Sequence, residues 1–367
     1  MNKTMCLNKG RLIAAGLCIL LFSAALFARG RDATSGAAAG LSLCGQIVIP
    51  SLFPFMIVAL FISRSGLSAW IGRLIGPLVS RFFKLPAAAA GPILLSFIAG
   101  YPVGARLTRG LYETGEVTLA QANTMLLFTV NAGPAFVVTA VGQGMFHSSS
   151  AGWLLLAIHI FVSLLIGVTV GHIRFRQSRP QPPRPQNMDK KTAGIMSAFV
   201  DAVSDASLSM LQICGWVVLF SVVLSLLRSS GLPAAPVTLL AGLSEVTTGA
   251  AAASSLHSLP LMSALLGWAG LSVQFQSLSS LGSLKPDVGC FFTARAVHGL
   301  LSMGITFLAL PFFPDALPVS TQPAVTAGRA LPLPAVMGLL LLMVVFLCFS
   351  SRGNVESSEM RLWSRPR

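Results

Sequence analysis

Charged side chains are scarce in this sequence and account for only 10% of its 367 residues. A soluble globular domain carries about 25% charged residues, so an ordinary soluble protein is excluded. Hydrophobic residues make up 54%, and apolar runs of about 20 residues, the length that crosses a bilayer, recur along the chain. These runs lack the alternation of barrel strands. Because only helices and closed barrels span lipid, the sequence predicts an all-α, polytopic membrane protein.

Residue patterns that mark catalytic and metal sites are also missing. The six cysteines have no metal-binding spacing and mostly lie in apolar runs, where a cysteine behaves as a small hydrophobic residue. No nucleophile–base pair and no phosphate-binding glycine loop is visible. We therefore expect no enzyme, no cofactor and no metal site.

Acidic residues are few as well, 11 against 25 lysines and arginines, which leaves a net charge of +14. The basic residues lie in loops between apolar segments and are not interleaved with aromatic residues, as they are in nucleic-acid-binding proteins. Basic loops beside membrane spans orient a protein in the bilayer. The expected partner is the lipid bilayer, and nucleic acid is not expected.

Ten apolar segments are present. We expect about eight of them to span the membrane and two, 87–108 and 236–256, to be re-entrant hairpins that return to the face they left. Residues 66–84 carry apolar side chains at helical intervals with cations off that stripe, which predicts an amphipathic helix in the membrane interface; residues 196–212 predict a second one. The ten segments are 12–28, 46–63, 87–108, 119–146, 151–173, 211–228, 236–256, 259–281, 290–313 and 333–350.

The two halves of the chain resemble each other. "FPFMIVALFISRSGL" and "GWVVLFSVVLSLLRSSGL" are followed by the broken segments "LLSFIAGYPVGA" and "LLAGLSEVTTGA", and then by "LLFTVNAGPAF" and "LLGWAGLSVQF". Duplicated membrane proteins with broken helices in matching places are typical of secondary transporters. The predicted domains are an N-terminal span, a first repeat, a basic proline-rich cytoplasmic linker, a second repeat, and a C-terminal span with a basic tail, at 1–36, 37–173, 174–194, 195–313 and 314–367.

The basic residues decide between full spans and hairpins. If 87–108 crossed the membrane, the cations of 64–84 would face away from the basic linker. With both hairpins re-entrant, both termini, the linker and most of the 25 basic residues face the cytoplasm, as loop lysines and arginines do. The two repeats are then inverted, with one hairpin entering from each face.

Glycine and proline in the first hairpin leave backbone groups unpaired, which is costly in hydrocarbon unless protein, water or a ligand pairs with them. Helix N-termini at such a break carry partial positive charge and bind anions. We predict a substrate site near the midplane that includes Gly100, Tyr101, Pro102, Gly104 and Arg106, with the arginine holding a carboxylate. The alternatives are an orienting role for Arg106 and simple close packing of the glycines.

Glu245, in "AGLSEVTTGA", is the only acidic residue well inside an apolar segment. An intramembrane carboxylate is typical of a proton carrier or an ion ligand. We therefore assign proton coupling and substrate binding to Glu245, with Thr248 beside it. A structural ion pair with Arg295 or Arg106 is the alternative.

The predicted site is completed by polar residues in matching places of the repeats and by one further arginine: Asn131, Gly133, Gln274, Gln276 and Arg295. Amides within spans suit hydrogen bonds to a ligand, and helix–helix packing is the ordinary alternative. The arginine would face the pocket or extend to the cytoplasmic interface. His159 and His298 also lie within predicted spans, where they would relay protons or form packing hydrogen bonds.

Five motifs together resemble the sporulation integral membrane protein family of the YlbJ type, within the nucleoside-recognition or gate-domain membrane proteins: "SLFPFMIVALFIS", "GYPVGAR", "NAGPAFVVTAVGQGMF", "LSEVTTGA" and "LSVQFQS…FFTARAVHGLLS". The resemblance implies a multi-pass protein of endospore-forming bacteria that moves dipicolinic acid out of the mother cell towards the forespore. It implies a place in the cell membrane or in the outer forespore membrane derived from the mother cell. It also implies kinship with nucleoside transporters, whose substrate lies between two opposed hairpins.

Two stretches depart from the pattern that the resemblance implies. Residues 130–134 are Val-Asn-Ala-Gly-Pro where an Asn-Asn-Ser-Gly-Pro-like run is expected, and residues 121–124 lack an expected acid and arginine. Three functions follow as alternatives: a transporter of dipicolinate or a similar small anion, a nucleoside permease, and a structural sporulation membrane protein whose basic linker holds anionic lipid. The oligomeric state is left open.

Overall fold

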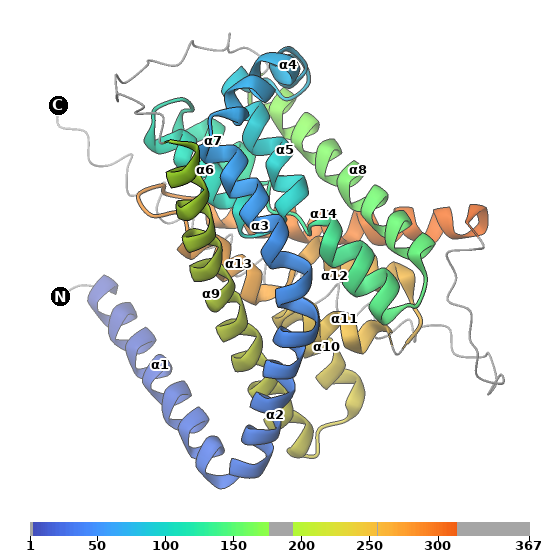
Figure 1. The fold of residues 1–367 in the computed structure, drawn as a ribbon. Helices are drawn as coiled ribbons and strands as arrows, with labels where there is room; N and C mark the ends of the chain where they lie inside the picture. Colours follow the sequence, from blue (N-terminus) through green and yellow to red (C-terminus); the bar gives the residue numbers. More distant parts are fainter. Residues whose placement is uncertain (1–2, 176–193, 255, 314–367) are drawn as a thin grey trace.

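The structure is a computed structural model that describes residues 3–175, 194–254 and 256–313. All regular elements of these residues are helices (Figure 1), which confirms the all-α class. The expected C-terminal span, 333–350, and almost all of the linker, 174–194, lie outside the described residues.

The first repeat begins with a long, nearly continuous helix. The first helix, α1 (Lys3–Ala28), stands apart from the packed helices in Figure 1 and turns at Arg29 into α2 (Gly30–Leu43). The chain continues through a π-helical turn, η1 (Cys44–Val48), into α3 (Ile49–Arg64). Residues 30–64 thereby form one apolar helix of 35 residues that is long enough to cross a membrane.

The second repeat begins with a helix of the same length, α9 (Ile195–Ser229). Each long helix is followed by a glycine in the left-handed conformation, Gly66 at φ 82° and Gly231 at φ 81°, a common way to end a helix. The separate interfacial helix expected at 196–212 is wrong, because this stretch is the first half of α9. No glycine or proline interrupts the chain there, and its small residues pack inside the protein.

The two long helices pack antiparallel, as inverted repeats require. Gly36 of α2 lies against the end of α9, where a Cβ atom would be only 2.7 Å from Cβ of Ser225. At the other end, Arg64 of α3 forms ion pairs with Asp205 and Asp201 near the start of α9. The glycine permits a close approach that any side chain would prevent.

The amphipathic helix expected at 66–84 is present as α4 (Leu67–Phe82). Its apolar residues Trp70, Leu74 and Leu78 are exposed on one face. The chain then bends by 112° into the next helical pair, so α4 does not continue the direction of its neighbour. An exposed apolar stripe with flanking cations suits a helix in the membrane interface.

Two pairs of short helices stand where hairpins are expected. The first consists of the 3₁₀ turn η2 (Ala87–Ala89), α5 (Ala90–Ala99) and α6 (Val103–Glu113), and the second of α10 (Ala234–Ser244) and α11 (Val246–Ser254). Arms of about ten residues measure about 15 Å, half of the hydrocarbon core. In the second pair a Cβ at Gly249 would lie 2.5 Å from Cα of Gly242, so the arms fold back on one another.

Two segments expected to be continuous spans are broken instead. Residues 119–146 form α7 (Leu119–Leu126), an unwound stretch at 127–133, and the π-helix η3 (Ala135–Met145). Residues 259–281 form α12 (Leu259–Trp268) and α13 (Gly270–Ser279), which meet at Ala269 with φ 69°. The run Asn-Ala-Gly-Pro and the pair Ala-Gly interrupt the two helices, so each repeat contains two broken elements in sequence.

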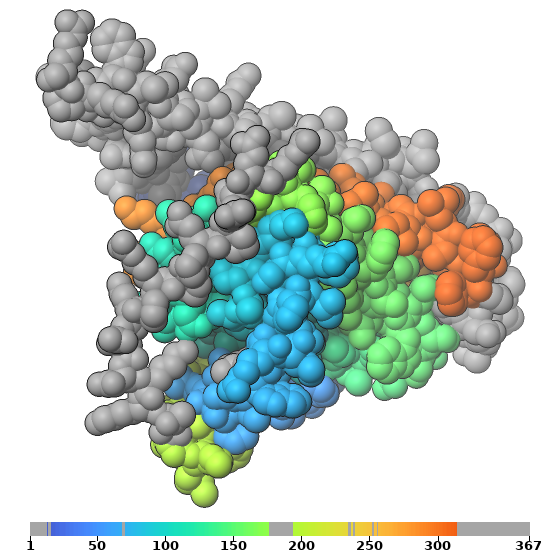
Figure 2. Space-filling view, turned by 90° about the horizontal axis from the view of Figure 1, so that it is seen from above, coloured from blue at the N-terminus to red at the C-terminus, as the bar shows by residue number. Residues whose placement is uncertain are grey.

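Each repeat ends with an unbroken apolar helix, α8 (Ser149–Arg174) in the first and α14 (Val288–Ala309), extended by η4 (Leu310–Phe312), in the second. The view from above places α8, in green, beside α14, in orange (Figure 2). Within the described residues, four helices are long and apolar enough to cross a membrane: 30–64, 149–174, 195–229 and 288–312. A multi-pass membrane protein is therefore confirmed.

Candidate functional site

The broken elements cross at their breaks in both repeats. In the first repeat, a Cβ at Gly100 would lie 2.6 Å from the backbone nitrogen of Gly133. In the second, a Cβ at Gly270 would lie 2.8 Å from the backbone nitrogen of Val246. Both Gly100 and Gly270 have positive φ, at 74° and 72°. The structure thus brings together Gly100 and Gly133, two residues of the predicted site.

The two hairpins meet at a small central cavity. Tyr101 of the first hairpin and Glu245 of the second both line it, together with Thr247 and Gln276. Its volume is about 20 Å³, which is room for about one water molecule. The centre of the protein is therefore closed to a substrate in this conformation.

The carboxylate of Glu245 is buried, with 2% of the residue exposed. It accepts hydrogen bonds from the backbone nitrogens of Thr247, at 2.9 Å, and Thr248, at 2.6 Å. It thereby caps the N-terminus of α11, where the helix dipole favours negative charge. In the described part of the chain Glu245 takes part in no ion pair, so the expected alternative pairing with Arg295 or Arg106 is absent there.

The first hairpin has no such carboxylate. In the alignment of "LLSFIAGYPVGA" with "LLAGLSEVTTGA", Gly100 takes the place of Glu245 and Gly104 that of Gly249. Tyr101 follows the break and is buried, and its hydroxyl has no hydrogen-bond partner within the described residues. The peptide bond between Tyr101 and Pro102 is cis.

Two of the predicted amides, Asn131 and Gln274, form hydrogen bonds to backbone carbonyl groups at the helix breaks. Asn131 donates from Nδ2 to the carbonyl oxygen of Phe128 at 2.6 Å, and Gln274 donates from Nε2 to that of Trp268 at 2.8 Å. Each amide has a side-chain oxygen without a partner in the described residues. These amides therefore pair with carbonyls that the ends of two broken helices leave free.

Arg295 is fully buried, so it does not extend to the interface. From α14 it donates to the carbonyl oxygens of Leu127 and Val130 in the unwound stretch of the first repeat. It does not line the cavity between Tyr101 and Glu245. Arg295 therefore pairs with backbone carbonyl groups that no helix satisfies. The sequence alone shows only that an arginine lies in an apolar segment, and not which groups it contacts.

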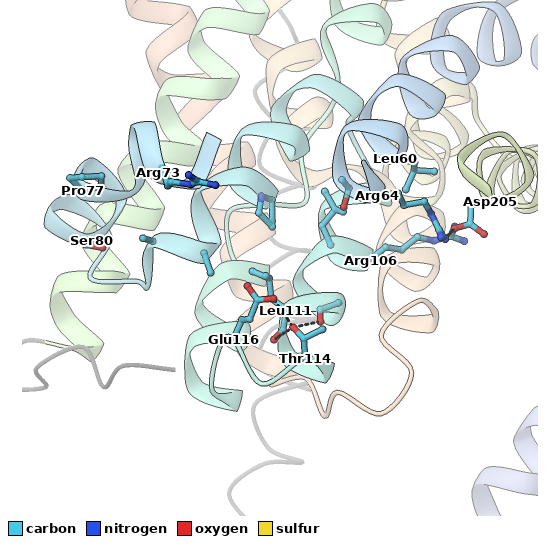
Figure 3. A pocket seen from close by; sticks show the side chains of 17 residues that line it. Leu60, Arg64, Arg73, Pro77, Ser80, Arg106, Leu111, Thr114, Glu116 and Asp205 are labelled. Carbon is cyan, nitrogen blue, oxygen red and sulfur yellow. Dashed lines mark hydrogen bonds and ion pairs between the residues drawn. The ribbon is translucent and has the colours of Figure 1, made fainter. Parts of the chain in front are cut away.

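Arg106 lies away from the hairpin break, in a cleft of about 820 Å³ (Figure 3). The cleft is also lined by Arg64, Arg73 and Asp205, and Figure 3 shows Arg106, Arg64 and Asp205 close together on one side of it. Arg106 is half-buried and donates to the hydroxyl of Ser209 on α9. The structure therefore separates this arginine from Gly100, Tyr101 and Pro102.

A smaller polar cleft of about 440 Å³ adjoins the first and shares Arg106 and Asp205 with it. Here Arg109 donates to Glu113 at 2.8 Å, and this hydrogen bond lowers the pKa of the Glu113 carboxyl below its usual range. The sequence prediction missed the acidic partner Asp205. Its only signal was the pair of aspartates spaced four residues apart on one helix face.

A third cleft, of about 500 Å³, is lined by α2, the last turns of α9, and α11. Its lining includes Arg228 and the predicted Thr248, together with Ser221 and Ser225. Each hairpin thus borders one cleft: α6 the cleft with Arg106, and α11 the cleft with Thr248.

Residues 46–148 match the family model described as "Gate: Nucleoside recognition". Over this stretch the chain is similar to the nucleoside-recognition Gate family. The match covers the first repeat from η1 to the end of η3, and so includes the first hairpin and the unwound stretch.

The chain is also 26% identical to the sporulation integral membrane protein YlbJ of Bacillus subtilis (strain 168), over 81% of this chain and 82% of that protein. The expected resemblance to proteins of the YlbJ type is confirmed. No solved structure matches the chain significantly.

Proposed function

We propose that this membrane protein is a secondary transporter of a small polar or anionic metabolite, and that the metabolite is dipicolinate leaving the mother cell during sporulation. The observation that carries the proposal is the meeting of two inverted hairpins at one closed centre, where Tyr101, Glu245 and Gln276 lie among apolar side chains. The similarity to a sporulation membrane protein supports the cellular setting, and the match to the nucleoside-recognition Gate model supports recognition of a small metabolite. We also propose that both termini face the cytoplasm and that the protein lies in the cell membrane or in the outer forespore membrane.

The distribution of open space suits alternating access. The central cavity of about 20 Å³ lies between Tyr101 and Glu245, whereas clefts of about 820 and 500 Å³ border α6 and α11. A carrier holds its site near the midplane and opens it to one face at a time. The closed centre between two open clefts is the arrangement that such a cycle passes through.

Charge in the larger cleft favours an anion. Its lining holds three arginines, Arg64, Arg73 and Arg106, against two acidic residues, Asp205 and Glu116. Arg64 forms ion pairs with Asp205 and with Asp201, which lies outside the lining. A planar dicarboxylate would exchange these contacts for bidentate pairs with guanidinium groups. The cleft would therefore gather the substrate on the cytoplasmic face.

At the centre, the hairpins differ in a way that suits an anionic substrate. Glu245 places its own carboxylate on the N-terminus of α11, while Gly100 brings no charge to the corresponding end of α6. A substrate carboxylate would take the position at α6 that Glu245 takes at α11. Protonation of Glu245 would weaken its hold on α11 and couple a proton to the movement of the hairpin.

Uptake of labelled dipicolinate into proteoliposomes tests the proposal. We expect accumulation by the unaltered protein, loss of proton-driven accumulation in Glu245→Gln, and at least a tenfold lower rate in Arg106→Ala. Arg81→Ala, which removes an exposed cation from α4 outside the clefts, is the matched control and should transport normally. Unaltered uptake in both site variants would remove the assignment of these residues.

A nucleoside permease is the second candidate, because the Gate description names nucleoside recognition. Competition separates the two candidates in the same liposomes. Inhibition of dipicolinate uptake by an excess of unlabelled dipicolinate and not by uridine supports dipicolinate. Uptake of labelled uridine that dipicolinate does not inhibit would replace it with the permease.

A further inference from the structure

The two repeats present the same pair of polar side chains on their last helices. His159 is the eleventh residue of α8 and His298 the eleventh of α14, and each is followed four residues later by a serine, Ser163 or Ser302. All four are buried, and the two imidazole rings stack with centroids 4.4 Å apart. Helical spacing of four residues puts each histidine and its serine on one face.

In the first repeat this pair holds the unwound stretch. The backbone nitrogen of Ala132 donates to Nε2 of His159 at 3.0 Å. The hydroxyl of Ser163 donates to the carbonyl oxygen of Phe128 at 2.6 Å. One N–H and one C=O of residues 127–133, which no helix pairs, are therefore satisfied by α8.

In the second repeat the equivalent pair forms no hydrogen bond to the facing segment within the described residues. The hydroxyl of Ser302 and Nδ1 of His298 have no hydrogen-bond partner in the part of the chain that the structure describes. Nε2 of His298 lies 3.1 Å from the carbonyl oxygen of His159. Because a carbonyl only accepts, Nε2 carries the proton and Nδ1 is a bare acceptor.

The reason for the difference is the state of the facing segment. Where the first repeat is unwound over 127–133, α12 stays helical to Trp268 and α13 resumes at Gly270. The last carbonyl of α12, that of Trp268, is taken by Gln274 at 2.8 Å. In the described residues, the hydroxyl of Ser302 and Nδ1 of His298 pair with none of the backbone groups of this segment, although buried polar groups without partners are unfavourable.

We propose that His298 and Ser302 are positioning residues for a second conformation, in which residues 265–271 unwind and dock on α14 as residues 127–133 dock on α8 here. In that conformation the first segment leaves His159 and Ser163. The functional role of this conformational exchange rests on the transport proposed above. The exchange would release one hairpin from its contacts and fix the other. Its test requires no substrate.

Hydrogen–deuterium exchange of the full-length protein in lipid nanodiscs measures the opening of residues 265–271. In a reversible opening the exchange rate follows the population of the open form, and one hydrogen bond changes that population about threefold to tenfold. Ser302→Ala removes a partner from the unwound form only, so exchange of 265–271 should slow by this factor. Ser163→Ala removes a partner from the present form only, so the same amides should exchange faster.

The two serines are matched controls for each other, because they are the same residue at the same position of equivalent helices. Opposite signs support the proposal. The same sign in both variants, or no change in Ser302→Ala, overturns it. Slower exchange in Ser302→Ala that spreads over all helices also overturns it, because removal of an unpartnered buried hydroxyl from a packed core stabilises the whole fold. Thermal melting of both variants shows that they are folded. Opposite signs without any dipicolinate uptake would retain this inference and remove the proposed substrate.

Discussion

Substitution of Arg295 by methionine tests how the unwound stretch of the first repeat is held. The guanidinium donates to the carbonyl oxygens of Leu127 and Val130 inside the protein. Methionine has a similar length and no donor, so Arg295→Met leaves two buried carbonyls without partners. Each costs about 1–3 kcal/mol.

The same substitution also removes a buried cation, whose desolvation opposes folding, and this offsets part of the loss. We expect a net destabilisation of about 3 kcal/mol. At about 2–4 °C per kcal/mol for a large domain, the melting temperature should fall by about 6–12 °C. The assay is thermal unfolding of the purified protein in detergent, with the exposed Arg81→Met as the control that should melt unchanged.

An unchanged or raised melting temperature in Arg295→Met would refute this reasoning. If the variant melted normally and lost dipicolinate uptake, Arg295 would instead be a direct substrate ligand. A fall in both quantities is expected from the structure, because the unwound stretch borders Gly100.

Two further predictions concern the first hairpin. Gly104→Ala should prevent accumulation of folded protein, measured as a monodisperse peak after detergent extraction, because a Cβ would lie 1.8 Å from the carbonyl oxygen of Thr129. The control is Gly110→Ala, which has open space around its Cβ and should be stabilised by about 0.5–1 kcal/mol. Equal yields of the two variants would contradict the close approach at Gly104. Because Arg109 lowers the pKa of Glu113, Glu113 stabilises the fold above its usual pKa of about 4.5 and loses this effect as pH falls through its lower folded value. Melting curves of Glu113→Gln and of the unaltered protein should therefore differ at pH 7 and converge once the pH falls below the lowered pKa of Glu113, and a constant difference would contradict the pairing.

The hairpin breaks were predictable because their sequences oppose a helix in apolar surroundings. Gly100 and Pro102 interrupt one apolar run, and a buried acid, Glu245, interrupts the other. Their local chemistry suffices to place the breaks, and the inverted order followed from the loop charges. Those signals need no knowledge of tertiary contacts.

The breaks at 127–133 and at Ala269 were missed for two different reasons. The first carries a visible signal, Asn131 to Pro134, that was assigned to ligand binding inside a continuous span. The second consists of an alanine with positive φ next to a glycine, which composition alone does not mark. In both cases a side chain outside the break pairs with its free carbonyl groups: Arg295, 165 residues away from Val130, in the first, and Gln274 in the second.

The placement of Arg106 and of residues 196–212 depended on tertiary structure. Arg106 follows the break by one helical turn, and its side chain reaches α9 instead of the centre. The stretch 196–212 has polar and apolar side chains at the spacing of an amphipathic interfacial helix. It nevertheless packs against α3 as part of one helix of 35 residues. Amphipathicity shows that a helix has two faces and not what covers them.

Accessibility of two introduced cysteines tests the central claim, that each hairpin borders a cleft open to a different side of the membrane. In a background without the six native cysteines, Gly110→Cys samples the cleft beside α6 and Ala251→Cys the cleft beside α11. A membrane-impermeant thiol reagent added to intact cells should label Ala251→Cys, whereas Gly110→Cys should react only when the cytoplasmic face is exposed. Labelling of both cysteines from the same face would contradict the inverted hairpins and the transport cycle built on them.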